Sequence, residues 1–120
     1  MRTLTLSVAS REETTARALA AFAGEPQGAR LSFASVDLLW RVLNPKRLAI
    51  LRAMTGAGAL TIREVARRVN RDVKAVHGDV HALLDAGLVE RTDDGRVVFA
   101  YDAVRLEFDL LSNRGIAKVT

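Results

Sequence analysis

A patch of basic and small side chains lies between residues 71 and 82, on a segment with the apolar period of a helix. Apolar residues recur there every three to four positions and predict a buried stripe: Val73, Val76, Val80, Leu83 and Leu84. The opposite side carries Arg71, Lys74, Ala75, Gly78 and Ala82, and His77 and His81 flank it. Lysine and arginine donate hydrogen bonds to phosphates and base edges, and small residues let a helix come close to a groove. The pattern indicates a surface for a polyanion.

The flanking sequence predicts the elements that position this helix. Thr61 and Glu64 have the spacing of a capping box, so a shorter helix begins at Thr61. Asn70-Arg71 forms the turn between the helices, Asp72 is a good N-cap for the second, and Gly87 ends it.

Residues 88–101, LVERTDDGRVVFAY, follow directly and have the pattern of a two-stranded hairpin with Asp94-Gly95 in its turn. The order helix, turn, helix, hairpin predicts a winged helix-turn-helix, in which the second helix enters the major groove of DNA. Residues near the start of such a helix reach base edges, whereas the preceding helix and the wing contact phosphates.

For base readout we assign Arg71, Lys74, Ala75, His77, Gly78 and His81. For phosphate contact we assign Arg63, Arg67, Arg68, Arg91 and Arg96.

Two features of the predicted recognition helix have alternative interpretations. Gly78 costs a helix about 1 kcal/mol relative to alanine, so it either permits close approach to DNA or reflects drift at a tolerant position. His77 and His81 are spaced to share a metal, but no cysteine or suitably placed acidic residue joins them. We expect neutral surface histidines near a phosphate, and no metal or cofactor.

The charge is unevenly distributed along the chain. Residues 41–96 hold eleven basic and seven acidic side chains, which accounts for the whole net charge of +4. A localised positive field is typical of proteins that bind nucleic acids. An arginine-rich composition is the alternative explanation, since arginine outnumbers lysine fifteen to three, but it would not place the excess in one segment.

Several classes of protein are excluded or disfavoured. The chain has no cysteine, so it forms neither disulfides nor thiolate metal sites, in keeping with a cytoplasmic protein. No segment has the roughly 18 apolar residues of a membrane span, and the N-terminal apolar run is too short for a secretory signal. No nucleophile–base motif or phosphate-binding loop occurs, so we expect a protein that is not an enzyme.

The remaining elements predict an α+β fold. Strands are expected at 3–8 and 104–110, with a short extended piece at 31–33. Helices are expected at 10–24, from Ser35 to the residue before Asn44, and from Pro45 onward, where Leu48, Leu51 and Met54 have helical spacing. Trp40 and Phe33 are expected in the core, and residues 112–120 as a frayed tail.

The expected organisation has three parts. Residues 1–34 form a strand-helix-strand extension, 35–101 the winged helix-turn-helix, and 102–120 a strand and flexible tail. The terminal strands form a separate small sheet or the contact of a homodimer, because open amphipathic edge strands promote aggregation. Leu4, Leu6 and Val8, and likewise Val104, Leu106 and Phe108, motivate this dimer hypothesis.

Two segments, NPKRLAILRAM (44–54) and RDVKAVHGDVHALLDAGLV (71–89), resemble small prokaryotic winged-helix regulators, MarR-like in the DNA-binding part and often encoded beside a toxin-like gene. The resemblance extends from Leu4 to Phe108. The resemblance implies a dimeric transcriptional repressor that binds double-stranded DNA. It also suggests that the protein is the antitoxin of a toxin–antitoxin pair and represses its own promoter. That family usually has polar or basic side chains where this chain has Ala75 and Gly78, which leaves more of the base reading to Arg71, Lys74 and His77.

Two alternative functions are open at this level. The chain is either a protein-interaction module, such as an antitoxin that acts by contact through residues 4–24 or through the exposed tail, or a non-specific, nucleoid-type DNA binder. Competition with random DNA distinguishes a non-specific DNA binder from a sequence-specific repressor.

Overall fold

The described helices begin at polar side chains that cap them, as the sequence predicts at Ser35, Thr61 and Asp72 but not at Asn44. The structure is a computed structural model, and it describes residues 2–8 and 29–108. The four helices in these ranges are α2 (Val36–Val42), α3 (Pro45–Met54), α4 (Ile62–Val69) and α5 (Val73–Asp85). Each N-cap side chain accepts a hydrogen bond from a backbone N–H of the first turn: Ser35, Asn44, Thr61 and Asp72. The predicted helix 10–24 and tail 112–120 lie outside the described residues.

The capping box of α4 is complete. The Glu64 N–H donates to the Thr61 hydroxyl at 3.1 Å, and the Thr61 N–H donates to the Glu64 carboxylate at 2.9 Å. At the other end Asn70 has a left-handed backbone, with φ of 56°, which allows a sharp turn into α5. Two turns of helix are thereby fixed at both ends by local interactions.

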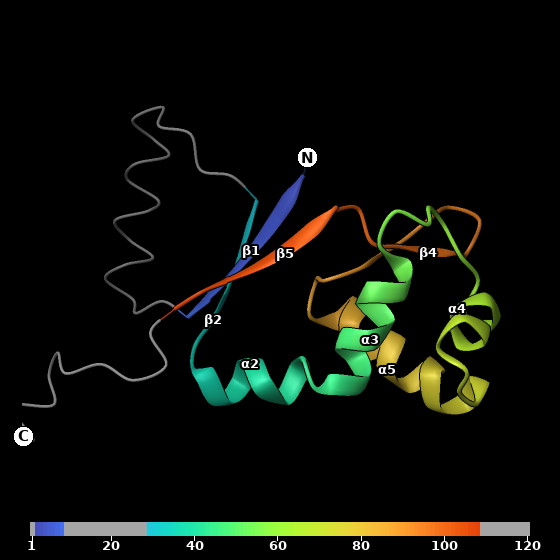
Figure 1. Cartoon of the computed structure of the whole chain (residues 1–120), viewed down its shortest axis with the longest axis horizontal. Helices are drawn as coiled ribbons and strands as arrows, with labels where there is room; N and C mark the ends of the chain where they lie inside the picture. The colour runs from blue at the N-terminus through green and yellow to red at the C-terminus, as the bar shows by residue number, and fades with distance from the viewer. Residues whose placement is uncertain (1, 9–28, 109–120) are drawn as a thin grey trace, which may run out of the picture.

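A parallel three-stranded sheet joins the two ends of the described chain. Its strands are β1 (Thr3–Val8), β2 (Arg30–Phe33) and β5 (Ala103–Glu107), in the order β2-β1-β5 (Figure 1). Leu6 pairs with Leu31 on one side and with Leu106 on the other, so the leucines share one face. Of the two alternatives for the terminal strands, pairing with each other in one sheet is the one observed.

A small antiparallel hairpin follows α5. It consists of β3 (Glu90–Arg91) and β4 (Val97–Val98), and the turn between them contains Gly95, with φ of 84°. Val97 also pairs with Leu60, in the segment that leads into α4. The hairpin is therefore fixed to the start of α4 as well as to the end of α5.

A single cluster of buried apolar residues connects the sheet, the helices and the hairpin. The largest side chains that are fully buried are Leu6, Leu39, Ile50, Leu51, Met54, Val65, Val76, Val80, Leu83, Leu88 and Val97. The predicted α+β class is confirmed. No helix within the described residues is long and apolar enough to cross a membrane.

Three apolar side chains are more exposed than the sequence predicts. Val73 is 39% exposed because it lies in the first turn of α5, beyond the part of the helix that packs on other elements. Leu48 is 39% exposed, whereas Ile50, which was not among the predicted core positions of this helix, is fully buried. Trp40 is exposed on α2, although Phe33 is buried as predicted. Periodicity identifies a helix face but does not show how far the neighbouring elements extend along it.

The position of β1 between β2 and β5 leaves it no free edge for the dimer contact that the sequence offered as an alternative. Leu4 and Leu6 are buried in the core of their own chain, because β1 is the central strand of the sheet. Leu106 lies on the same face but on an outer strand, where it is 45% exposed.

Candidate functional site

The first half of α5 has one buried side and one exposed side. Val76 and Val80 are fully buried, whereas Lys74, Ala75, His77 and Gly78 are exposed. The carboxylate of Asp72 accepts the Lys74 N–H at 3.0 Å and fixes the start of the helix, leaving the Lys74 ammonium in solvent. The structure thus brings four of the six residues assigned to base readout onto one open helix face.

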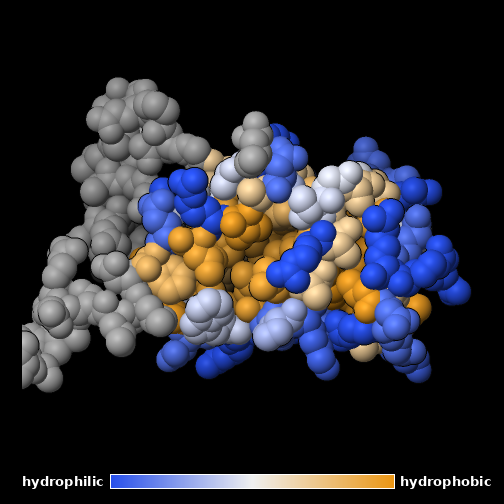
Figure 2. Space-filling view, viewed as in Figure 1, coloured by the Kyte–Doolittle hydropathy of each residue, from blue (hydrophilic) through white to orange (hydrophobic). Residues whose placement is uncertain are grey.

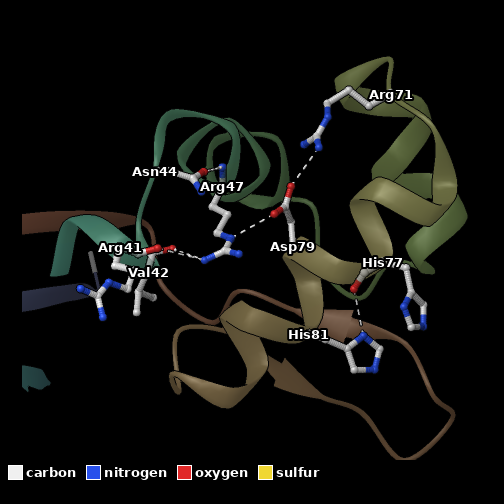
Figure 3. Close-up of polar contacts among 8 residues, drawn as sticks. All are labelled: Arg41, Val42, Asn44, Arg47, Arg71, His77, Asp79 and His81. Atoms are coloured by element: carbon white, nitrogen blue, oxygen red, sulfur yellow. Dashed lines mark hydrogen bonds and ion pairs between the residues drawn. The ribbon is translucent and has the colours of Figure 1, made fainter. Parts of the chain in front are cut away.

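Arg71 does not extend from this face. Its Nη2 lies 2.9 Å from a carboxylate oxygen of Asp79, two turns along α5, and its side chain is only 23% exposed (Figure 3). The sequence pattern placed Arg71 in the groove because the residue precedes the helix on the exposed side. The tertiary structure instead turns its guanidinium back onto the flank of α5, so Arg71 is engaged within the protein.

Asp79 binds a second arginine as well. The Nε of Arg47, on α3, lies 3.0 Å from the other carboxylate oxygen of Asp79. The Nη1 of Arg47 also donates to the carbonyl oxygens of Arg41 and Val42, at 3.2 and 3.0 Å (Figure 3). The three side chains Arg47, Asp79 and Arg71, hereafter the Asp79 cluster, connect the end of α2, the start of α3, the α4–α5 turn and α5.

The electrostatics of the Asp79 cluster favour the ionised carboxylate. Burial of Asp79 opposes ionisation, but the hydrogen bonds and positive charges of Arg47 and Arg71 outweigh it and lower the pKa of Asp79. The pattern of residues does not predict this cluster, because Arg47 and Asp79 are 32 residues apart in the chain. The one feature of the sequence that points to the cluster is Asp79 itself, an acidic residue in a mainly basic segment.

His77 and His81 lie on a different side of α5 from Asp79 (Figure 3). Their ring centroids are 4.1 Å apart, and the Nδ1 of His81 is 2.9 Å from the carbonyl oxygen of His77. Since a carbonyl oxygen only accepts, Nδ1 carries the proton and Nε2 of a neutral His81 is an acceptor. Within residues 2–8 and 29–108, no group of three or more histidine, cysteine or acidic residues could hold a metal ion.

The five arginines assigned to phosphate contact are exposed. Arg63, Arg67 and Arg68 lie on α4, which packs against α5. Figure 2 shows hydrophilic side chains gathered over the part of the molecule that contains α4 and the start of α5. Arg91 and Arg96 lie on the β3–β4 hairpin. The site is therefore a helix face bordered by cations on two neighbouring elements.

Acidic groups near these arginines are held in the ionised form by local hydrogen bonds. The backbone N–H and then the hydroxyl of Thr61 lower the pKa of Glu64, and the charges of Arg96 and Arg67 act in the same direction. At the hairpin tip, the Thr92 hydroxyl donates to Asp94 and lowers its pKa, helped by the Arg96 N–H. The tip carries Asp93 and Asp94, so its negative charges offset part of the field of Arg96.

A sequence model of the HVO_A0114 protein family matches residues 42–106. The chain belongs to the HVO_A0114 family. The part shared with the HVO_A0114 family begins at the last residue of α2 and continues through the hairpin into β5. It therefore contains α5, the Asp79 cluster and the five arginines assigned to phosphate contact. Strands β1 and β2 lie outside it. No curated protein and no solved structure matches the chain.

Proposed function

We propose that the protein is a DNA-binding transcriptional regulator, in which α3–α5 and the β3–β4 hairpin act as a winged helix-turn-helix. In this proposal α5 is the recognition helix, α4 precedes it, and the hairpin is the wing. The proposal is carried by the first half of α5, whose exposed side holds a lysine, a histidine, an alanine and a glycine. The order of elements agrees with the way that such folds dock on DNA.

The proposed contacts differ from those suggested by the sequence at Arg71 and His81, which are both partly buried. Lys74 and His77 read base edges, Ala75 and Gly78 permit close approach, and His81 lies at the border of the groove. Arg63, Arg67 and Arg68 of α4 and Arg91 and Arg96 of the wing contact phosphates. Arg71 supports the helix from inside the protein through Asp79.

The likeness to MarR-type regulators suggests a repressor, and the toxin–antitoxin role rests on that likeness. Neutralising a partner protein is the alternative function, and its expected surface, residues 4–24, falls mostly outside the described residues. The exposed face of α5 favours DNA.

The deciding experiment selects DNA from a random duplex library with the full-length protein and measures affinity for the selected site by fluorescence anisotropy. Lys74→Ala is expected to weaken binding by about 1–3 kcal/mol if Lys74 reads bases, with a smaller loss on random DNA. Arg52→Ala is the matched control, because Arg52 is an exposed cation on α3 to which the proposal assigns no DNA contact.

Three outcomes would change the proposal. Failure of the protein to bind any duplex at low salt would refute DNA binding. Equal affinity for selected and random DNA at physiological salt would identify a non-specific, nucleoid-type binder. If Lys74→Ala has no effect while Arg63→Ala or Arg96→Ala abolishes binding, α5 is not the helix that reads the groove.

A further inference from the structure

Within the part of the chain that the structure describes, strand β5 has an open edge. It is an outer strand of the sheet and pairs only with β1 within the described residues. Its residues Arg105, Leu106 and Glu107 are all exposed. An edge strand with apolar residues and free backbone groups is a template for pairing with another chain, and native proteins usually cover such an edge.

The backbone of β5 determines which residues face that edge. The Ala103 N–H donates to the carbonyl oxygen of Arg2, at the start of β1. Because successive residues of a strand direct their backbone groups to opposite sides, Arg105 and Glu107 also point these groups toward β1. The N–H and C=O groups of Val104 and Leu106 therefore point outward and are available to a further strand.

The side chains of β5 are self-complementary in the antiparallel direction. The sequence Val104-Arg105-Leu106-Glu107-Phe108 has apolar residues at its centre and ends, with a cation on one side of the centre and an anion on the other. If two copies pair about an axis at Leu106, Leu106 lies opposite its own equivalent and Val104 lies opposite Phe108. The same register places Arg105 opposite Glu107 twice. Opposite charges on facing residues stabilise a strand pair.

We infer that two copies of this chain form a dimer by antiparallel pairing of their β5 strands, centred on Leu106. In this register the two facing Leu106 residues can exchange both backbone hydrogen bonds, because each directs its N–H and C=O to the open edge. A two-fold axis can pass between two such residues. The sheet then continues across the axis as β2-β1-β5 followed by the partner's β5, β1 and β2. Glu107, already 3.2 Å from Arg30, gains a second arginine at its exposed side.

An exposed apolar surface beside β5 supports a second copy as the occupant. Trp40 of α2 is 45% exposed and contacts Phe108 edge to face, with ring centroids 6.2 Å apart. Figure 2 shows apolar side chains gathered over β5 and between the sheet and α2. Stable dimers bury about 1,200–2,000 Å² in total, more than one short strand supplies. The exposed side chains of Leu106 and Trp40 extend the contact beyond the strand backbone.

The register is tested by cysteine pairs, because the natural chain has no cysteine. In the double variant Arg105→Cys/Glu107→Cys, the facing Cα atoms would be about 4.5 Å apart, within the range of a disulfide. Under mild oxidation this variant is expected to form a covalent dimer. The single variant Arg105→Cys is the control, since its thiols would be two residues out of register. Equal crosslinking of the two variants, or none, would overturn the register.

The dimer itself is tested by sedimentation and light scattering on the full chain without DNA, so the result is independent of the proposed DNA binding. Leu106→Lys places two ammonium groups opposite each other and is expected to raise the dimer dissociation constant by roughly tenfold or more. Leu48→Lys makes the same change at a similarly exposed leucine on α3 and should leave the dimer intact. Circular dichroism verifies that both variants fold. A wild-type protein that is monomeric at tens of micromolar, or a dimer unaffected by Leu106→Lys, would overturn the proposal.

Discussion

At the scale of single residues, Asp79 decides which cations remain available to a partner. Its carboxylate is 15% exposed and receives one arginine on each oxygen, Arg47 at 3.0 Å and Arg71 at 2.9 Å. A carboxylate this buried is stable as an anion only when it is paired and hydrogen-bonded. The pairing removes Arg71 from the exposed face of α5 and leaves Lys74 as the cation nearest the start of that face.

We expect Asp79→Asn to lower the free energy of unfolding at neutral pH by about 1–3 kcal/mol, because both arginines lose a charged partner. The pKa of Asp79 is lowered in the folded protein, so its contribution to stability is present above the pKa of the unfolded chain and disappears as pH falls through the folded value. The difference between wild type and variant should therefore shrink below about pH 4. Urea denaturation at neutral and acidic pH measures both effects.

Asp85→Asn is the matched control for this experiment. Asp85 is an exposed residue in the last turn of the same helix, where a negative charge is slightly unfavourable to the helix dipole. Its replacement should leave stability nearly unchanged. If Asp79→Asn is as stable as Asp85→Asn at neutral pH, the Asp79 cluster does not hold α5 in place.

At the scale of elements, α5 combines a tightly packed side with a side that has little bulk. Gly78 lies in the middle of this helix, and a Cβ added there would meet no atom within 4 Å. The free protein therefore gives no packing reason for glycine at this position. Two explanations remain from the sequence, close approach to DNA or drift at a tolerant site, and one substitution separates them.

Gly78→Ala is expected to raise the free energy of unfolding by about 0.5–1 kcal/mol, because alanine favours a helix and the site has room. If α5 enters the groove closely at this point, the same variant should bind the selected DNA site more weakly despite its higher stability. Chemical denaturation and anisotropy on the same preparations provide the two measurements. Unchanged DNA affinity would favour drift, and lower stability would mean that the helix does not tolerate the added methyl group.

At the scale of the whole molecule, the exposed arginines on α4 and the hairpin border α5 from two elements, and the proposed dimer contact is on β5. Each phosphate contact contributes a slope of about −0.9 to the dependence of log K on log salt. If all five arginines contact phosphates, we expect a slope of about −4 to −5 for one protomer and about twice that for a dimer on a palindromic site. Titrations between about 50 and about 200 mM salt measure this slope.

The variant Leu106→Lys connects this prediction to the dimer. On a single half-site it should keep the slope of one protomer, because the substitution is on β5, away from the proposed DNA contacts. On the palindromic site it should lose the additional slope of the second protomer. A wild-type slope near −1 would show that the arginines of α4 and the hairpin do not contact phosphates.

The sequence by itself determined the elements that depend on neighbours within about four residues. The caps at Ser35, Thr61 and Asp72, the buried positions Val76, Val80 and Leu83, and the turn at Gly95 all follow from local hydrogen bonds, helical period or backbone conformation. For the same reason the exposed face of α5 was predictable, since a helix with one buried side must present the other to solvent.

Only the tertiary structure decided which residues remain on that face and which strands remain open. Arg71 was assigned to DNA from its place in the sequence, but its position depends on Asp79 and on Arg47 from another helix. The two terminal strands had similar apolar patterns, yet β1 is central and buried whereas β5 is at the edge. Ion pairs and strand order between distant segments are set by how the elements pack together, and the local pattern of side chains carries no information about that packing.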